Sequence, residues 1–162
     1  MYKLMAIILF MSVWITLLAL QTDEELSMKQ LFEGKRAVNR AAHAAAQQLD
    51  RAALADGVLR IDEAAARLAA EAYLRANLRL DANGQPLPGS SLRDKPEIAV
   101  FDIINDSHTF PYRYTNDLYS YEATLKRPGV VIILKMDYPR VFEALPKIGW
   151  AIKGVAEPVI RY

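Results

Sequence analysis

The sequence predicts an α+β protein in which a long N-terminal helix of transmembrane type is followed by a second, short helix and a C-terminal antiparallel β-sheet. Three observations support this prediction. Residues 4–20 carry no charge, residues 22–80 place apolar residues at helical spacing, and the chain from residue 96 is rich in β-branched and aromatic residues. Helical signals that all precede the strand signals are typical of an α+β fold.

Residues 4–20 are expected to form a helix in a membrane or an equally apolar environment. Only Ser12 and Thr16 interrupt the apolar run with hydroxyl groups, and at about 1.5 Å per residue the run spans roughly 25 Å, slightly less than a hydrocarbon core. The end of the run lacks the small residues of a signal-peptidase site, so we expect a retained anchor. The residues predicted to form this anchor, or the core of an equally apolar assembly, are Leu4, Ile7, Ile8, Phe10, Met11, Trp14, Ile15 and Leu18.

The flanks of this segment predict its orientation in the membrane. Lys3 precedes the apolar run, whereas Asp23, Glu24 and Glu25 follow it. Basic residues alone do not decide the orientation, since Lys29, Lys35 and Arg36 also follow the run. From the early position of the run and its acidic exit we expect the N-terminus inside and the bulk of the chain outside. The absence of cysteine fits an exported protein that uses no disulfides.

From Thr22 the helix is expected to continue to about Leu54, because no proline interrupts it and Gly34 is its only glycine. Asp56 and Gly57 are expected to end it, with Gly57 as a left-handed cap. The predicted divisions are an apolar segment at 1–21, its amphipathic continuation at 22–57 and an extracytoplasmic headgroup at 58–162. Apolar residues at spacings of three, four and seven predict a packing stripe, which consists of Leu31, Val38, Ala41, Ala45, Leu49 and Ala52.

A second helix is predicted after a short extended link at residues 58–61. Asp62 is a suitable N-cap residue, and Glu63 lies favourably in the first turn. The expected buried stripe is Ala65, Leu68, Ala69, Ala72 and Ala76. The alternating charges at intervals of four indicate a solvated face, made of Glu63, Arg67, Glu71 and Arg75.

The remainder of the chain predicts strands. Residues 97–104 are one strand, residues 119–126 alternate as a half-buried strand, and residues 130–134 are a strand buried on both faces. Proline and glycine at residues 127–130 predict a type II turn. A connecting excursion is expected at 141–148 and a last strand at 150–162.

No catalytic, metal-binding or cofactor-binding pattern is found in the sequence. The two histidines lie far apart, with His43 on a polar helix face and His108 in a predicted turn. We therefore expect no enzyme, no metal and no cofactor. The net charge of +1 gives no reason to expect a nucleic-acid partner, and no small-molecule partner is predicted either.

One aromatic cluster is a candidate binding surface on the headgroup. Aromatic side chains this close together also build the face of a sheet and its loops, and this second interpretation remains open. The candidate residues are Phe110, Tyr112, Arg113, Tyr114, Tyr119 and Tyr121.

Two stretches resemble the TadE/TadG-like pseudopilins of Flp (Tad) pili, within the wider group of type IV pilin-like subunits. The first is the arginine- and alanine-rich sequence KRAVNRAAHAAA at 35–46. The second is VVIILKMDYP at 130–139, followed by Leu145-Pro146 and the closing strand. The resemblance departs from the pilin pattern at the fifth residue, which is Met5 where pilins usually carry glutamate after a short basic leader.

The resemblance implies a structural pilin or pseudopilin that assembles through its N-terminal helix into an extracellular filament. Its implied partners are copies of itself, the membrane before assembly and the pilus assembly machinery. Two alternatives remain open. One is a membrane-anchored module whose residues 110–121 hold a small ligand or a wall polymer. The other is an accessory component of a pilus or secretion machine that does not itself polymerise.

Overall fold

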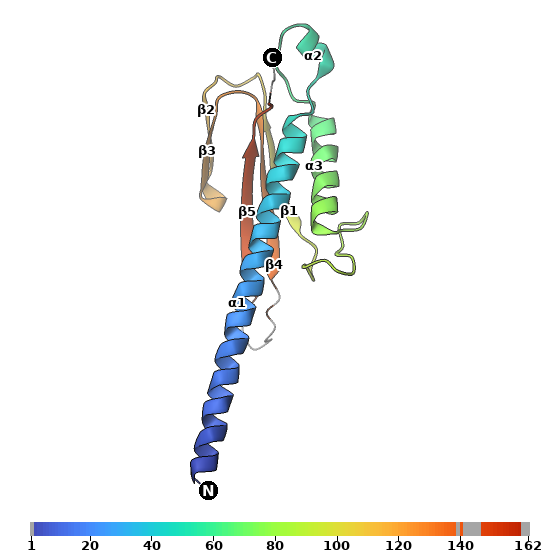
Figure 1. Ribbon diagram of the computed structural model, residues 1–162. Coiled ribbons are helices and arrows are strands. Elements are labelled where there is room, and N and C mark those ends of the chain that lie inside the picture. Colours follow the sequence, from blue (N-terminus) through green and yellow to red (C-terminus); the bar gives the residue numbers. More distant parts are fainter. Residues whose placement is uncertain (1, 139, 141–146, 160–162) are drawn as a thin grey trace.

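A computed structural model of the chain describes residues 2–138, 140 and 147–159, and every structural statement below concerns these residues. It confirms the predicted α+β fold, with a long apolar N-terminal helix, a short helix and a C-terminal antiparallel sheet (Figure 1). The elements in chain order are α1 (Tyr2–Ala46), α2 (Arg51–Ala55), α3 (Glu63–Leu78), β1 (Glu97–Ile104), β2 (Tyr112–Asn116), the 3₁₀-helix η1 (Asp117–Tyr119), β3 (Tyr121–Leu125), β4 (Gly129–Tyr138) and β5 (Ile148–Ala156).

Helix α1 is continuous over 45 residues and includes Gly34. The predicted continuation to Leu54 is wrong, because α1 ends at Ala46. Asp50 starts the separate helix α2 by accepting hydrogen bonds from the backbone N–H groups of Ala52 and Ala53. Gly57 has the expected left-handed backbone, with φ of 78°, but it follows α2 and not α1.

The main sheet has three antiparallel strands in the order β1–β4–β5. Its central strand β4 is buried over the predicted residues 130–134, which confirms that prediction. Strands β2 and β3 pair with each other as a separate hairpin. The last strand ends at Ala156, earlier than expected, and most of the predicted excursion at 141–148 lies outside the described residues.

The connections around the hairpin differ from the prediction in three respects. Residues 112–116 form the strand β2, which the sequence did not indicate, and residues 117–119 form the 3₁₀-helix η1, so that β3 begins only at Tyr121. The predicted type II turn is wrong. Gly129 opens β4 opposite Ile104, and the residues of positive φ do not include it. A Cβ on Gly129 would lie 2.8 Å from the carbonyl oxygen of Ala156, so this strand position leaves no room for a side chain.

Helices cover one face of the sheet and the hairpin covers the other. Side chains of Val130, Ile132, Leu134 and Met136 pack with α1 and α3, whereas Val131 packs with residues of β1 and the hairpin. In Figure 1, α1 runs across β5 and β4 with α3 on one side, and the β2–β3 hairpin lies on the other. The headgroup is therefore a three-layer arrangement around β4.

Two glycines bring α1 unusually close to the sheet. A Cβ on Gly34 of α1 would lie 2.5 Å from Ile152 Cδ1 and 2.7 Å from Met136 Sδ. A Cβ on Gly154 of β5 would lie 2.7 Å from Val38 Cγ1. Because each missing side chain makes room for its neighbour, α1 and the sheet interlock at both points.

Helix α3 begins as predicted but buries a different stripe. Asp62 caps the helix by accepting from the N–H of Ala65. The residues predicted to be buried are wrong, since Leu68 is 66% exposed and the core side chains lie elsewhere on the helix. Alanine occurs on several faces of this helix, so periodicity alone does not select one of them. The buried residues of α3 are Ala66, Ala70, Leu74 and Leu78.

The charged line of α3 is also only partly solvated. Glu63 and Arg67 are exposed, whereas Glu71 and Arg75 are half-buried. The Arg67 guanidinium lies over the Phe101 ring, 4.6 Å from its centroid. This line of charges therefore lies beside β1.

Candidate functional site

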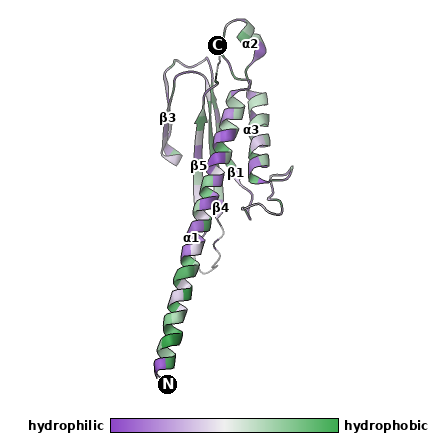
Figure 2. Ribbon diagram, viewed as in Figure 1, coloured by the Kyte–Doolittle hydropathy of each residue, from purple (hydrophilic) through white to green (hydrophobic). Residues whose placement is uncertain are grey.

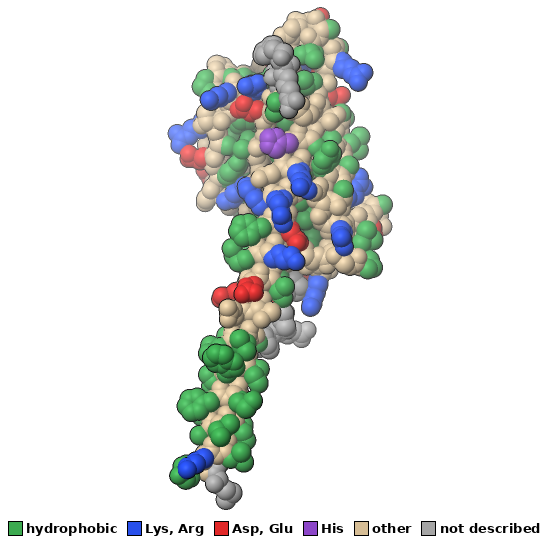
Figure 3. Space-filling view, viewed as in Figure 1, with side chains coloured by type: hydrophobic (Ala, Val, Ile, Leu, Met, Phe, Trp, Pro, Cys, Tyr) green, Lys and Arg blue, Asp and Glu red, His purple; other side chains and the backbone are tan. Residues whose placement is uncertain are grey.

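The first half of α1 projects beyond the headgroup with apolar side chains on all sides. Figure 2 shows this half, residues 2–22, as a hydrophobic rod, which we call the apolar rod. On the face displayed in Figure 3 it is free of contacts with the headgroup. Before Asp23 no described side chain is buried, and Phe10 is 74% exposed. All eight predicted anchor residues are exposed: Leu4, Ile7, Ile8, Phe10, Met11, Trp14, Ile15 and Leu18.

The hydroxyl groups of Ser12 and Thr16 are satisfied within the helix. Ser12 Oγ donates to the Ile8 carbonyl and Thr16 Oγ1 donates to the Ser12 carbonyl, each at 2.9 Å. Beyond the first turn, the backbone N–H groups donate within the helix. Within the described residues, α1 is the one helix long and apolar enough to cross a membrane by length and composition. A helix that is apolar all round is suited to a membrane or to burial among other helices.

The buried face of α1 begins with three polar residues, which the sequence analysis missed. Asp23, Ser27 and Gln30 are buried, at the spacings of four and three that lead on to Gly34 and Val38. A backward extension of the predicted stripe at helical spacing would have found them. Of the predicted stripe itself, Val38, Ala41 and Ala45 are fully buried, Leu31 and Leu49 pack at its edge, and Ala52 is exposed.

Asp23 joins α1 to the end of β4 at the point where the helix enters the headgroup. Asp23 as a residue is 1% exposed. Tyr138 Oη donates to Asp23 Oδ1 at 3.1 Å, and Arg140 Nη1 lies 3.7 Å from Asp23 Oδ2. Burial, together with the hydrogen bond and the negative charge of Asp23, raises the pKa of Tyr138. The carboxylate thus fixes the headgroup at the base of the exposed rod.

Replacing Tyr138 by phenylalanine is expected to destabilise the headgroup by about 1–2 kcal/mol, because the buried Asp23 carboxylate loses a hydrogen-bond donor. Chemical denaturation of the detergent-solubilised chain measures the change. Tyr73→Phe, at an exposed position on α3, is the control and should leave the stability unchanged. Equal stability of the two variants would contradict this role for Tyr138.

The aromatic cluster lies mainly between the hairpin and the sheet. Tyr114 is buried and donates to Asp102 Oδ2 at 2.6 Å. Phe110, Tyr112 and Tyr121 pack against the same apolar cluster as Tyr114. Most of these aromatic side chains therefore build the hairpin–sheet contact rather than an open binding surface.

The two remaining members of the predicted surface lie at the border of this layer. Arg113 is exposed and pairs with Glu122 across the hairpin at 2.6 Å. Tyr119 is half-buried, and the Lys135 ammonium lies 5.7 Å from its ring centroid. Neither side chain extends the aromatic layer into a continuous outer surface.

Tyr114 is expected to make the stability pH-dependent in the alkaline range. Burial, followed by the hydrogen bond to Asp102, raises its pKa to about 12. The folded-state pKa is thus higher than the unfolded value of about 10, so the stabilisation is complete below pH of about 10 and is lost as the pH rises towards about 12. Thermal unfolding across this pH range should show a smaller loss of stability for Tyr114→Phe than for the wild type. An equally steep loss in that variant would contradict the assignment.

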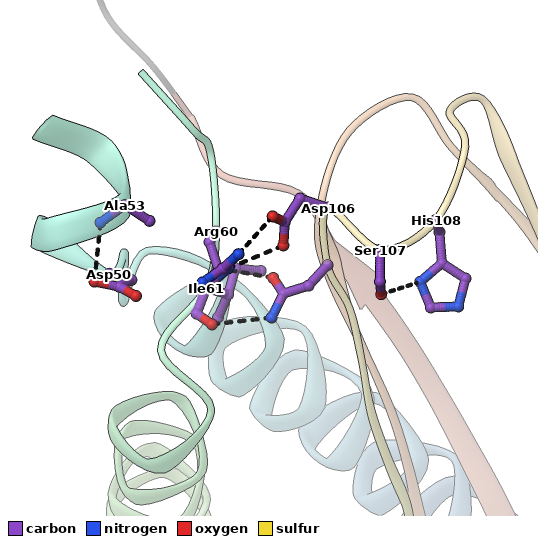
Figure 4. A network of polar contacts seen from close by, with 8 residues as sticks. Asp50, Ala53, Arg60, Ile61, Asp106, Ser107 and His108 are labelled. Atoms are coloured by element: carbon purple, nitrogen blue, oxygen red, sulfur yellow. Dashed lines mark hydrogen bonds and ion pairs between the residues drawn. The ribbon is translucent and has the colours of Figure 1, made fainter. Parts of the chain in front are cut away.

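A polar network connects the loop after β1 to the link between α2 and α3 (Figure 4). Arg60 donates to both carboxylate oxygens of Asp106, at 3.0 and 2.7 Å. The Asn105 side chain accepts from the N–H of Ile61 and donates to its carbonyl. His108 lies nearby and contacts Ser107 Oγ at 3.2 Å. These contacts position loops, and among the described residues no group of His, Cys, Asp or Glu is arranged to hold a metal ion.

Comparison with known proteins finds no matching family model, no matching curated protein and no matching solved structure. The resemblance to pseudopilins therefore stays a prediction that rests on the sequence. The structure itself shows a contrast between the two halves of α1. The first half, before Asp23, exposes apolar side chains on every side, while the second half buries one face against the core of the headgroup.

Proposed function

We propose that this chain is a structural subunit of an extracellular type IV pilus-like filament of the Tad kind, in which copies assemble through the first half of α1. The observation that carries the proposal is the exposed apolar rod. It continues without a break into the second half of α1, which packs against the sheet of the headgroup. Because the second half of α1 interlocks with the sheet at Gly34 of α1 and Gly154 of β5, a force on the rod is transmitted directly to the headgroup.

The apolar rod supports assembly with several neighbours rather than one. A dimeric coiled coil needs one apolar stripe, whereas this segment is apolar around its whole circumference. Ala6, Ser12, Thr16 and Ala19 are small enough to allow close helix–helix approach. The membrane would hold the same segment before assembly, and a bundle of identical rods would replace the lipid afterwards. In this proposal the N-terminus lies inside and the headgroup outside.

Electron microscopy of material sheared from cells, with mass spectrometry of its main band, tests the proposal. We expect filaments whose principal protein is this chain. If the chain stays in the membrane fraction and no filament contains it, the proposal is wrong. An anchored module or a non-polymerising accessory component then becomes the better interpretation.

A further inference from the structure

A basic cavity of about 670 Å³ lies between α1, the C-terminal end of α3 and the loop that follows it. Figure 3 shows basic side chains gathered over this face of the headgroup, above the apolar rod. The lining includes one acidic side chain, Glu33, against five cationic ones. The cationic residues are Lys29, Arg36, Arg40, Arg79 and Arg93.

Two of the arginines are held in place by hydrogen bonds that leave most of their donors available. Arg40 Nη1 donates to Asn77 Oδ1 at 2.6 Å, which joins α1 to α3. Arg79 Nη1 donates to the Gly89 carbonyl at 3.2 Å. A guanidinium group has five N–H donors, so each arginine retains several for a ligand. Within the described part of the chain, none of the five cations takes part in an ion pair.

The wall of the cavity also contains a buried amide without a partner. Gln30 is 2% exposed, and neither its Nε2 nor its Oε1 has a hydrogen-bond partner among the described residues. Buried polar groups in proteins are almost always paired. A rotation of the Gln30 side chain towards the cavity would let its amide N–H groups donate to a bound anion.

We propose that this cavity binds a ligand whose phosphate groups carry at least two negative charges. Guanidinium groups bind phosphate oxygens in pairs, and several arginines with little opposing charge favour a multiply charged anion. The volume lies within the range of small-molecule sites, about 300–1,000 Å³. Lys29 follows the apolar run by nine residues, roughly 13 Å along the helix. Both a soluble polyphosphate and the headgroup of a diphosphate lipid can therefore reach the cavity.

Calorimetry with sodium tripolyphosphate tests the site on the full chain in a neutral detergent. The double variant Arg36→Gln, Arg40→Gln should bind at least tenfold more weakly than the wild type. The double variant Arg51→Gln, Lys126→Gln removes the same charge from exposed positions outside the cavity lining and should bind as the wild type does. Circular dichroism establishes that both variants are folded.

Three results would overturn the proposal. They are no binding by the wild type, equal weakening in both double variants, and equally tight binding of citrate, which would show that the site does not prefer phosphate. Native mass spectrometry from micelles of cardiolipin and phosphatidylcholine then identifies the source. Cardiolipin retained by the wild type and lost from the Arg36→Gln, Arg40→Gln variant supports the site with a lipid ligand. Tripolyphosphate binding without cardiolipin retention supports it with a soluble ligand.

Discussion

Replacing Met11 by lysine is expected to reduce the yield of filaments about a hundredfold. Met11 lies in the middle of the exposed apolar rod, and a charge at the centre of a membrane helix costs about 3 kcal/mol on insertion scales, which corresponds to roughly two factors of ten. The same charge would have to be buried again among apolar neighbours in a filament. Quantitative immunoblotting of the sheared fraction measures the yield.

Met28→Lys is the matched control for this experiment. Met28 lies on α1 beyond the apolar rod and is 46% exposed, so a lysine there meets solvent. We expect filament yield and membrane retention close to the wild type. If both variants lost filaments equally, sensitivity to charge would not be confined to the rod, and the proposed assembly surface would be contradicted.

The variant Gly154→Val is expected to destabilise the headgroup by about 3 kcal/mol or to prevent its folding. Even a Cβ at this position lies 2.7 Å from Val38 Cγ1 and 3.4 Å from the Val38 carbonyl oxygen of α1. Removing this steric overlap requires α1 to move away from the sheet, which disturbs the packing of a well-filled core. Chemical denaturation followed by circular dichroism measures the loss of stability.

Gly149→Ala on the same strand is the control for the packing argument. Gly149 is exposed, and a Cβ there meets only the flexible Asp137 side chain, at 3.1 Å from Oδ1. We expect Gly149→Ala to lower the stability of the headgroup much less than Gly154→Val does. A small effect of Gly154→Val, similar to that of the control, would mean that α1 does not rest closely on β5.

The fold class was predictable because its signals are long and of different kinds. The charge-free run, the alternation of apolar and polar residues and the β-branched stretch at residues 130–134 each point to one structure. Asp62 at the start of α3 was also predictable, since capping depends on a single local residue.

Features that depend on contacts between distant residues were not predictable. Helix α1 ends at Ala46 because Leu49 forms a β-bridge with Ile61 and Asp50 starts a new helix. The buried stripe of α3 follows from its packing on α1, which alanine-rich periodicity does not specify. The separate β2–β3 hairpin arises from tertiary packing against the back of the sheet.

The candidate sites differ in the same way. The apolar rod could be predicted from the sequence because a continuous run of apolar residues is a local signal. The basic cavity was not predicted because its residues come from distant parts of the chain, namely α1, the end of α3, the following loop and Tyr138 of β4. The overall charge is balanced, so composition gave no signal of it.

Cysteine cross-linking in sheared material tests the central proposal most directly. The chain has no cysteine of its own, so single substitutions at Met5, Leu9, Val13 and Leu17 report only on the exposed rod. If copies assemble through α1, each substitution should give covalently linked pairs of this chain in the sheared fraction. If the chain is present there and none of the four positions cross-links, or if the sheared fraction lacks the chain, assembly through the N-terminal helix is contradicted.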